Sequence, residues 1–370
     1  MKWADYLVRF FVGALFIFSG LVKLNDPMGT EIKLAEYFEV FATDFGHFFT
    51  GFVPFALPIG MFLIILEIVL GVAVLLAYRM NLTVRALGVI IVFFTFLTFY
   101  SAYFNKVTDC GCFGDAIPLT PWESFGKDLL LVALIGYLYW RQGHFTPLLA
   151  EKVNLGILAG ATVLSLYLGI HAINHLPFID FRPYAVGDNI PANMQPPEQP
   201  EFIYTFTKDG QEITSKKYLS ADEGYTYVGY KVINQENTVP KITDYNIYNE
   251  ELGDYTARSF TGPKLFLIVY EAGAADTRRM ADIAALIANL DDTIEAIAIT
   301  ASAGDDFRQF LANYSLNIPF FYGDATVLKA MIRSSPGLML LNEGTVLGKW
   351  HYNDTPTAAE VHRLLHQKSR

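Results

Sequence analysis

The most constraining feature of the sequence is a succession of long apolar segments in its first half. A membrane-spanning helix needs about 20 consecutive, predominantly apolar residues, and five segments pass this test. They run from about Tyr6 to Leu24, Pro54 to Tyr78, Ala86 to Phe104, Trp122 to Trp140 and Val153 to Ala172. A single segment of this kind could be a buried core helix, but five in succession predict a helical bundle that spans a membrane.

The fourth segment is the weakest of the five, because Lys127 and Asp128 lie in its first turns. Both charges are near a helix end, where long side chains can reach the lipid headgroups. The first segment has no small-residue cleavage site, so we expect a retained span and not a cleaved signal peptide. After about residue 175 the chain has the regular polar residues of a soluble domain. Its formal net charge of −10 argues against nucleic-acid binding.

Basic residues near the predicted spans indicate how the bundle is oriented. They flank the loops on one side of it: Lys2, Arg9, Arg79, Arg85, Arg141 and Lys152. Short cytoplasmic loops carry an excess of Lys and Arg, so this side is predicted to be cytoplasmic. The opposite side then holds residues 25–53, residues 105–121 and the chain after 173. We therefore expect a multi-pass protein of a bacterial inner membrane, with a cytoplasmic N-terminus and a periplasmic C-terminal domain.

Residues 32–49, on the predicted outer side, carry apolar and aromatic residues at helical spacing. This pattern is typical of an amphipathic helix that lies on a bilayer surface. The lipid bilayer is thus an expected partner of the first half of the chain.

Both cysteines of the chain lie in the outward-facing loop, as Cys110-Gly-Cys112. A disulfide between residues two apart closes a very small ring and adds little stability. Strained or exposed disulfides are the most easily reduced ones, and a bacterial extracytoplasmic space is oxidising. These arguments favour a redox couple over a structural clip, which stays as an alternative. A metal site is a weaker alternative, because zinc normally takes four ligands and no nearby His completes a set.

Charged residues surround the cysteine pair. Asp109 and Asp115 flank it and would raise the pKa of a thiol there. Lys106 and Lys127 would oppose this effect if the chain folded them close to the thiols.

Glu67 lies in the middle of the second predicted span. A carboxylate inside a membrane is costly, so it indicates either a functional group or a structural ion pair between helices. Lys23, near the outer end of the first span, is the expected partner. Ser19 and Gly20 lie close by at an expected helix contact, where small residues allow close packing.

Three stretches resemble the MauE/DoxX family of small membrane proteins: FSGLVKLNDP at 18–27, Glu67 with Gly71, and DCGCFGD at 109–115. This family is similar to the four-helix core of vitamin K epoxide reductase and of the membrane disulfide oxidases. The resemblance covers about residues 1–145 and implies a four-helix bundle associated with extracytoplasmic thiol chemistry. Those oxidases use a Cys-x-x-Cys pair and a second shuttle pair, whereas this chain has one Cys-x-Cys. A quinone is therefore a candidate cofactor, but the chain lacks the second thiol pair that would complete an electron relay to it.

The second half of the chain shows a β-rich stretch and then alternating strands and helices. A hairpin with a Lys-Asp-Gly turn is expected within 201–219, followed by short strands at 225–233 and 242–249. Beyond these, the pattern predicts strands at 264–270 and 294–300, helices at 275–290, 305–314, 325–332 and 357–367, and a hairpin at 336–351.

This order of elements resembles the thioredoxin fold, and the lead-in to it is similar to that of TlpA-type redoxins. The stretch MIRSSPGLMLLNEGTVLGKW (331–350) is the most specific part. Pro336 matches the cis-proline of thioredoxins, so we expect a cis bond between Ser335 and Pro336. Ala274 and Thr277 stand about where a thioredoxin carries its two cysteines. The resemblance therefore implies a domain that cannot exchange disulfides itself.

A cysteine-free thioredoxin-like domain could be retained for packing or for binding. We favour binding, because the edge at Ser335 and Pro336 is a surface where a peptide can dock by strand pairing. The expected partner is an extracytoplasmic protein client or redox partner.

Taken together, these observations predict an α-helical transmembrane bundle followed by an α/β thioredoxin-like extracytoplasmic domain. The expected parts are a MauE/DoxX-like four-helix domain (1–145), a fifth transmembrane helix (146–176), a linker (177–200) and a thioredoxin-like domain with a β-rich N-terminal extension (201–370).

The expected function is that of an accessory protein in thiol–disulfide chemistry, with Cys110 and Cys112 as the redox pair. Whether that pair makes the protein an enzyme is left open by the sequence. One alternative is a non-enzymatic membrane scaffold or assembly factor. Another is a DoxX-like small subunit of a quinone-linked oxidoreductase, with Glu67 and Lys23 near the quinone.

Overall fold

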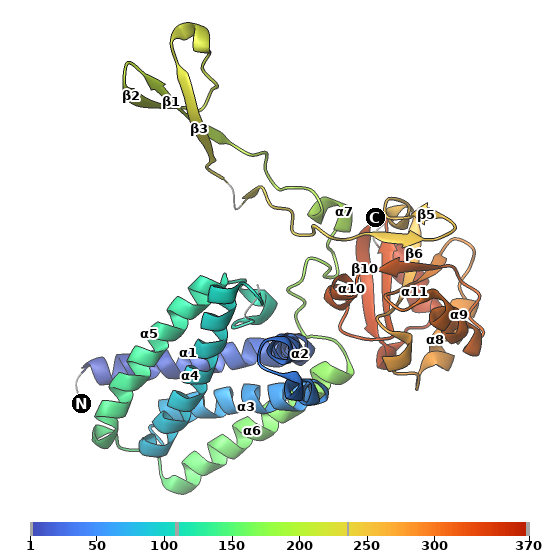
Figure 1. Cartoon of the computed structure of the whole chain (residues 1–370). Coiled ribbons are helices and arrows are strands. Elements are labelled where there is room, and N and C mark those ends of the chain that lie inside the picture. The colour runs from blue at the N-terminus through green and yellow to red at the C-terminus, as the bar shows by residue number, and fades with distance from the viewer. Residues whose placement is uncertain (1–2, 108–110, 235–236, 368–370) are drawn as a thin grey trace. The chain divides into compact units, whose positions relative to one another are not determined.

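The computed structural model describes residues 3–107, 111–234 and 237–367 of the chain (Figure 1). The chain divides into two compact units, residues 1–182 and residues 183–370. The first unit is helical and the second contains two β-sheets. This division agrees with the predicted fold class, a membrane bundle followed by an α/β domain.

Within residues 3–107 and 111–182, the helical unit contains six long helices. They are α1 (Trp3–Asn25), α2 (Pro27–Asp44), α3 (Ala56–Leu75), α4 (Met80–Phe104), α5 (Pro121–Arg141) and α6 (Glu151–Asn174). Local signals explain where several of them begin. The Asp26 side chain accepts the backbone N–H of Gly29 at the start of α2, and Thr120 and Glu123 form a reciprocal capping box at the start of α5.

Helices α1 and α3 approach each other closely at two glycines. A Cβ atom added to Gly71 would lie 2.8 Å from the carbonyl oxygen of Gly13, and one added to Gly13 would lie 2.9 Å from that of Gly71. Neither position has room for a larger residue. Small residues thus bring the two backbones together, as is common between helices in membranes.

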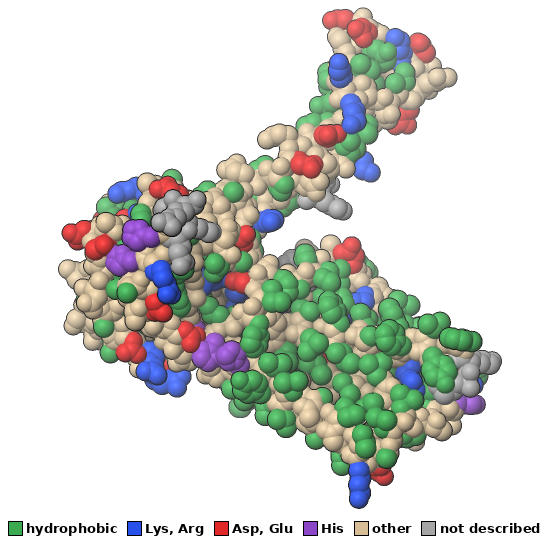
Figure 2. Space-filling model, turned by 180° about the vertical axis from the view of Figure 1, so that it is seen from behind, with side chains coloured by type: hydrophobic (Ala, Val, Ile, Leu, Met, Phe, Trp, Pro, Cys, Tyr) green, Lys and Arg blue, Asp and Glu red, His purple; other side chains and the backbone are tan. Residues whose placement is uncertain are grey.

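Four helical stretches within the described residues are long and apolar enough to cross a membrane: Trp3–Asn25, His47–Leu75, Met80–Phe104 and Glu151–Asn174. The chain is therefore a membrane protein. Figure 2 shows hydrophobic side chains covering most of the visible face of the helical unit. Phe10, Phe62, Val89 and Leu155 are among the large apolar residues that this unit leaves exposed, as expected for contact with lipid.

The fourth predicted span, residues 122–140, does form a helix, α5, but it is not among these four stretches. The physical reason is its charge, because Glu123, Lys127, Asp128 and Arg141 all lie along it. This helix packs mainly against α4. Asp128 is buried within the unit, so the carboxylate of this residue faces protein and not lipid.

The second unit is centred on a seven-stranded sheet with the order β10-β9-β6-β7-β8-β4-β5. Its strands are β4 (Ile247–Asn249), β5 (Gly253–Asp254), β6 (Pro263–Val269), β7 (Glu295–Thr300), β8 (Phe320–Gly323), β9 (Gly337–Asn342) and β10 (Thr345–His351). Strands β6, β7 and β8 are parallel, and the other pairings are antiparallel. Four helices accompany the sheet: α8 (Met280–Ala288), α9 (Gly304–Asn313), α10 (Ala325–Met331) and α11 (Ala358–Gln367).

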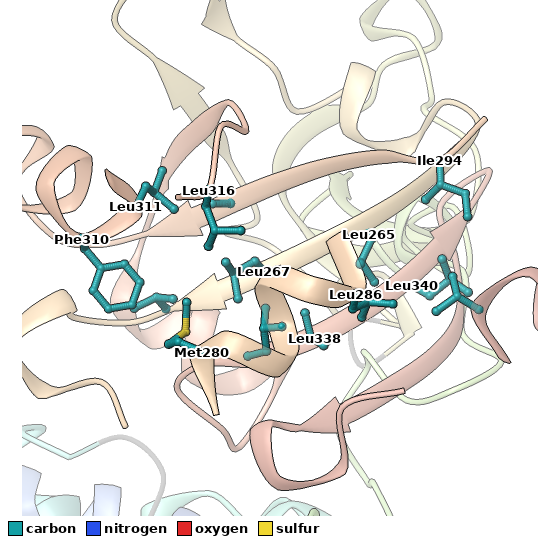
Figure 3. Packing of buried hydrophobic residues seen from close by; sticks show 14 of the residues in the cluster. Leu265, Leu267, Met280, Leu286, Ile294, Phe310, Leu311, Leu316, Leu338 and Leu340 are labelled. Atoms are coloured by element: carbon teal, nitrogen blue, oxygen red, sulfur yellow. The ribbon is translucent and has the colours of Figure 1, made fainter. Parts of the chain in front are cut away.

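The core of this unit covers both faces of β6, so neither face of the strand contacts solvent. This explains why its sequence is a run of mainly apolar residues. Every residue of β6 after Pro263 is buried. Figure 3 shows Leu265 and Leu267 of β6 packed with Met280 and Leu286 of α8 and with Phe310 of α9. This packing holds the end of β6 rigidly beside β9.

Strand register places the predicted cis-proline at the same end of the sheet. Ile268 of β6 pairs with Gly337, the first residue of β9. Pro336 therefore lies just before β9, beside the C-terminal end of β6. The Ser335–Pro336 peptide bond is cis, as the sequence predicted.

Two features of this unit differ from the sequence-based expectations. Strand β8 was not predicted, and the helix expected at 275–290 begins only at Met280. Part of the predicted linker, 177–200, is also ordered against the sheet. The backbone N–H of Gly187 donates to Val346 (2.8 Å), and that of Ile190 donates to Gly344 (2.9 Å).

A separate three-stranded sheet has the order β2-β1-β3. Its strands are β1 (Phe202–Lys208), β2 (Gln211–Ser215) and β3 (Thr226–Val232). The predicted hairpin is confirmed, with Asp209 and Gly210 both at positive φ (52° and 75°) in the turn. Positive φ at both central positions is what the favoured two-residue hairpin turn requires.

Candidate functional site

The candidate site is the loop between α4 and α5, which carries both cysteines. Asp109 and Cys110 lie outside the described residues, so the structure speaks to the pair through Cys112. Cys112 is half-buried, and the next residue, Phe113, is buried. Asp115 is exposed on the same loop.

Ser19 of α1 connects this loop to the buried carboxylate of α3. Its hydroxyl oxygen lies 3.0 Å from the carbonyl oxygen of Cys112 and 3.1 Å from Oε2 of Glu67. The hydroxyl has one proton, so it donates to one of these acceptors at a time. The sequence singled out Ser19 only as a small residue at a helix contact, and the structure adds this polar link.

Glu67 and Lys23 form the ion pair that the sequence predicted. Lys23 Nζ lies 2.7 Å from Oε1 of Glu67, and the carboxylate side chain is 2% exposed. The Lys23 ammonium also lies 4.8 Å from the ring centre of Phe94 on α4. The pair therefore ties α1 to α3 beneath the cysteine loop, with α4 beside it.

A second ion pair, with a buried carboxylate and a partly exposed lysine, lies on α5. Lys127 Nζ is 2.5 Å from Oδ1 of Asp128, whose side chain is 1% exposed, and Thr98 of α4 donates to Oδ2 of Asp128 at 3.0 Å. The Lys127 ammonium lies 5.4 Å from the ring centre of Phe113, next to Cys112 in the chain. Of the two lysines named from the sequence, Lys127 thus approaches the cysteine loop, whereas Lys106 pairs with Asp44 at 3.3 Å.

The thiol of Cys112 lies within the electrostatic reach of both pairs. Burial raises its pKa above the ordinary value for a cysteine. Lys127 is the strongest opposing influence, Asp128 adds to the rise in pKa, and Lys23 lowers it. Cys112 is thus a half-buried thiol whose pKa is raised overall, with two nearby cations opposing part of that rise.

Sequence reasoning missed the contributions of Ser124, Asp128 and Thr98 to this site. The signal for two of them was present, because Ser124 and Asp128 are four residues apart and therefore share a helix face with each other. The contact of Thr98 with Asp128 depends on how α4 packs on α5, which no local pattern reveals.

In the thioredoxin-like unit, a charged network lies beside Ala274 and Thr277, the positions predicted to correspond to the missing dithiol. Arg278 Nη2 lies 2.6 Å from Oδ2 of Asp276, and the Tyr352 hydroxyl donates to the same oxygen at 2.8 Å. The Arg278 guanidinium holds the pKa of the Asp276 carboxyl well below its usual range. Ala274 ends a short 3-10 turn, and Thr277 lies in the loop before α8.

Ser335 is tied to this loop from two sides. The backbone N–H of Asp276 donates to the Ser335 carbonyl at 3.0 Å, and the N–H of Tyr270 donates to its hydroxyl at 3.1 Å. A carbonyl oxygen has two lone pairs, so the one at Ser335 keeps acceptor capacity for an added strand.

The comparisons with known proteins agree with this division of the chain. Residues 1–141 match the family model of methylamine utilisation protein MauE. Protein TlpB of Flavobacterium psychrophilum is 25% identical to the C-terminal part of the chain over 175 residues. That match covers 45% of this chain and 44% of TlpB, so the chain spans less than half the length of this curated relative. No solved structure matches significantly. The chain therefore joins a helical region similar to MauE, over residues 1–141, to a thioredoxin-like domain.

Proposed function

We propose that this protein acts in extracytoplasmic thiol–disulfide chemistry at a bacterial inner membrane, with Cys110 and Cys112 as the exchanging pair. The observation that carries the proposal is the position of Cys112 near two ion pairs with buried carboxylates, Lys23–Glu67 and Lys127–Asp128. Ionisable groups inside a membrane unit are costly and tend to mark functional sites. A loop that is only clipped by a small disulfide needs no such groups.

The chemistry is a reversible two-electron exchange. A client thiolate attacks one sulfur of the Cys110–Cys112 disulfide, the S–S bond breaks, and the other sulfur leaves as a thiolate. A second client thiolate then attacks the mixed disulfide and releases the first sulfur. The client dithiol is oxidised to a disulfide and the loop pair is reduced, with the two client protons passing to the released thiolates or to water.

Repeated oxidation of clients requires a two-electron acceptor for the reduced pair. We propose a membrane quinone as the class of acceptor, because the loop follows directly on α4, a helix apolar enough to cross a membrane. The chain contains no second thiol pair that could relay the electrons.

The thioredoxin-like unit is proposed to bind the client or a redox partner. It has no cysteine, so it contributes no thiol of its own. Its proposed docking surface is the segment before β9 at Ser335 and Pro336, where an extended peptide would add by strand pairing.

One observation favours a second candidate, a membrane scaffold or assembly factor in which the cysteines only close a loop. The dithiol position of the thioredoxin-like unit is occupied by the Asp276–Arg278 pair, which points to binding without exchange in that unit.

The two candidates differ in the reduction potential of the Cys110–Cys112 bond, measured on the full chain in detergent against glutathione or dithiothreitol buffers. An exchanging pair should have a potential near about −200 mV, whereas a structural clip should lie below about −300 mV. In cells, Cys110→Ser and Cys112→Ser each leave one thiol that can trap a client as a mixed disulfide. A potential below about −300 mV together with no trapped protein from either variant would refute the exchange function.

The orientation is tested separately with an impermeant maleimide on intact cells after mild reduction. Labelling of the cysteines before lysis is expected. Labelling only after lysis would place the loop on the cytoplasmic side and contradict the proposal.

A further inference from the structure

We propose that Lys127 is the residue that stabilises the thiolate of Cys112, with Ser124 as a second hydrogen-bond donor and Asp128 as the group that orients Lys127. This inference rests on the proposed exchange function and assigns roles within its site. It makes Lys127 and Asp128 positioning residues for the exchange, in addition to the two cysteines.

The first step of the argument is the helix face on α5. Ser124, Lys127 and Asp128 are spaced by three and four residues, so they lie together on one side of the helix. Ser124 and Asp128 are each 1% exposed. The face that carries them is therefore turned into the protein, toward α4 and the cysteine loop.

The second step is the hydroxyl of Ser124. Its oxygen is buried and has no hydrogen-bond partner within residues 3–107, 111–234 and 237–367. It lies close enough to the Cys112 thiol to favour the ionised form. A buried donor without a partner is costly, and a thiolate at Cys112 would provide the missing acceptor.

The third step is the way in which the ammonium group of Lys127 is held. Oδ1 of Asp128 accepts from the ammonium group at 2.5 Å, and the hydroxyl of Thr98 donates to Oδ2 of Asp128 at 3.0 Å. An ammonium group has three donors, so Lys127 keeps others for the sulfur of Cys112, which lies within its electrostatic reach. Its contact with the Phe113 ring, at 5.4 Å, keeps it at the loop.

Charges on the other elements around the loop are each committed elsewhere or act more weakly. Lys23 of α1 is paired with Glu67 of α3 and influences Cys112 less than Lys127 does. Lys33 of α2 lies beside Gly111 and pairs with Glu36 at 3.5 Å. Lys127 is thus the cation best placed to act on the sulfur of Cys112.

The chemical consequence concerns the leaving group. When a client thiolate attacks the Cys110 sulfur, the electron pair of the S–S bond passes to Cys112, which leaves as a thiolate. A better stabilised leaving thiolate leaves faster. Lys127 and Ser124 would receive that charge in a site from which water is largely excluded, where a nearby cation acts strongly.

The test uses the full chain in detergent with Cys110→Ser, so that Cys112 is the only thiol. The rate of alkylation by iodoacetamide, a neutral probe, is measured against pH. We expect Lys127→Gln to lower the rate near pH 8 by about tenfold, which corresponds to a pKa higher by about one. Lys127→Arg, which keeps the charge, should restore most of the rate. Lys106→Gln is the matched control, because Lys106 flanks the same loop but pairs with Asp44, and it should leave the profile unchanged.

A second variant tests the sign of the effect. Asp128→Asn keeps an oxygen that can accept from Lys127 but removes the negative charge near Cys112, so it should move the profile to lower pH, opposite to Lys127→Gln. If Lys127→Gln fails to fold, Ser124→Ala decides: a profile moved to higher pH supports the proposal, and an unchanged profile overturns it. A Lys127→Gln profile that superimposes on the parent, or a loss of rate that Lys127→Arg does not restore, would also overturn it.

These outcomes are distinct from failure of the exchange function. Alkylation reports the state of Cys112 whether or not any client exists. If the profiles behave as expected while no client is trapped in cells, the exchange function fails but the assignment of Lys127 to the thiolate stands. If clients are trapped but the profiles do not move, the assignment fails and the exchange function stands.

Discussion

Removal of the Glu67 carboxylate is the most direct test of the buried polar network. Glu67→Ala would leave the Lys23 ammonium in an apolar surrounding without its partner at 2.7 Å. At an effective dielectric constant of about 20, two unit charges at that separation attract by about 6 kcal/mol. Breaking a buried pair by removing one partner costs about 3–5 kcal/mol in measured cases, because the remaining charge stays buried.

Two features of the structure place the expected loss at the lower end of this range. Lys23 keeps its contact with the Phe94 ring at 4.8 Å, and a cation over an aromatic face gains about 0.5–2 kcal/mol. Ser19 keeps the Cys112 carbonyl as an acceptor. We therefore expect a loss of about 3 kcal/mol, or a melting temperature lower by about 6–12 °C for a unit of this size.

The assay is thermal unfolding of the full chain in detergent, followed by the fluorescence or circular dichroism of the helical unit. The matched control is Glu151→Ala, because the Arg79–Glu151 pair has the same 2.7 Å separation but both side chains are more than half exposed. Exposed pairs contribute little, so this variant should melt close to the parent. A Lys23→Met/Glu67→Met double variant should regain most of the loss, since apolar residues can replace a buried pair.

Two results would refute this reasoning. Equal losses from Glu67→Ala and Glu151→Ala would show that burial does not decide the strength of the pair. A double variant as unstable as Glu67→Ala would show that the loss comes from packing and not from an unpaired charge.

Two further predictions concern other parts of the molecule. Gly71→Ala should destabilise the helical unit by roughly 1–3 kcal/mol because its Cβ would meet the Gly13 carbonyl, whereas Gly88→Ala, with open space at the Cβ, should be neutral or stabilising; thermal unfolding of both variants checks this. Asp276→Asn should lower the melting temperature of the thioredoxin-like unit at pH 7. The pKa of Asp276 is depressed in the folded state, so its contribution is complete above the unfolded pKa near 4 and is lost as the pH falls through the folded pKa. The difference in melting temperature between Asp276→Asn and the parent should therefore narrow below about pH 4, in melts recorded across the acid range. A difference that stayed constant would contradict the depressed pKa of Asp276.

The helices of the membrane unit could be predicted because length and hydropathy decide them locally. Strand β8 could not, although it lies in the middle of the sheet order. A segment of four residues, Phe320–Gly323, is too short to show a hydrophobic period. Its strand conformation is decided by pairing with β7 and β4. Such pairing depends on residues far away in the chain, which a local pattern does not contain.

The candidate site shows the same limit. The Lys23–Glu67 pair was predictable because Glu67 is the lone charge of its apolar segment and needs a partner, and Lys23 lies near the outer end of the preceding segment. The approach of Ser19 to Cys112 joins residues 93 apart in the chain, and Lys127 reaches the cysteine loop only through the packing of α5 on α4. These contacts come from tertiary packing, so the sequence could name the residues but not which lysine faces the thiol.

Under the proposed function, the distribution of cysteines makes exchange and client binding separable. Both cysteines lie in the membrane unit, while the thioredoxin-like unit has Asp276 and Arg278 beside its dithiol position. A Cys110→Ser/Cys112→Ser chain should therefore lose the ability to oxidise a reduced two-cysteine peptide. The same chain should still bind that peptide in its oxidised form, because binding is assigned to the edge at Ser335 and Pro336. Equilibrium binding by fluorescence anisotropy measures the second property independently of the first. If the double substitution abolished binding while the melting of residues 183–370 was unchanged, the cysteine loop itself would be the client site, and the thioredoxin-like unit would have to serve another partner.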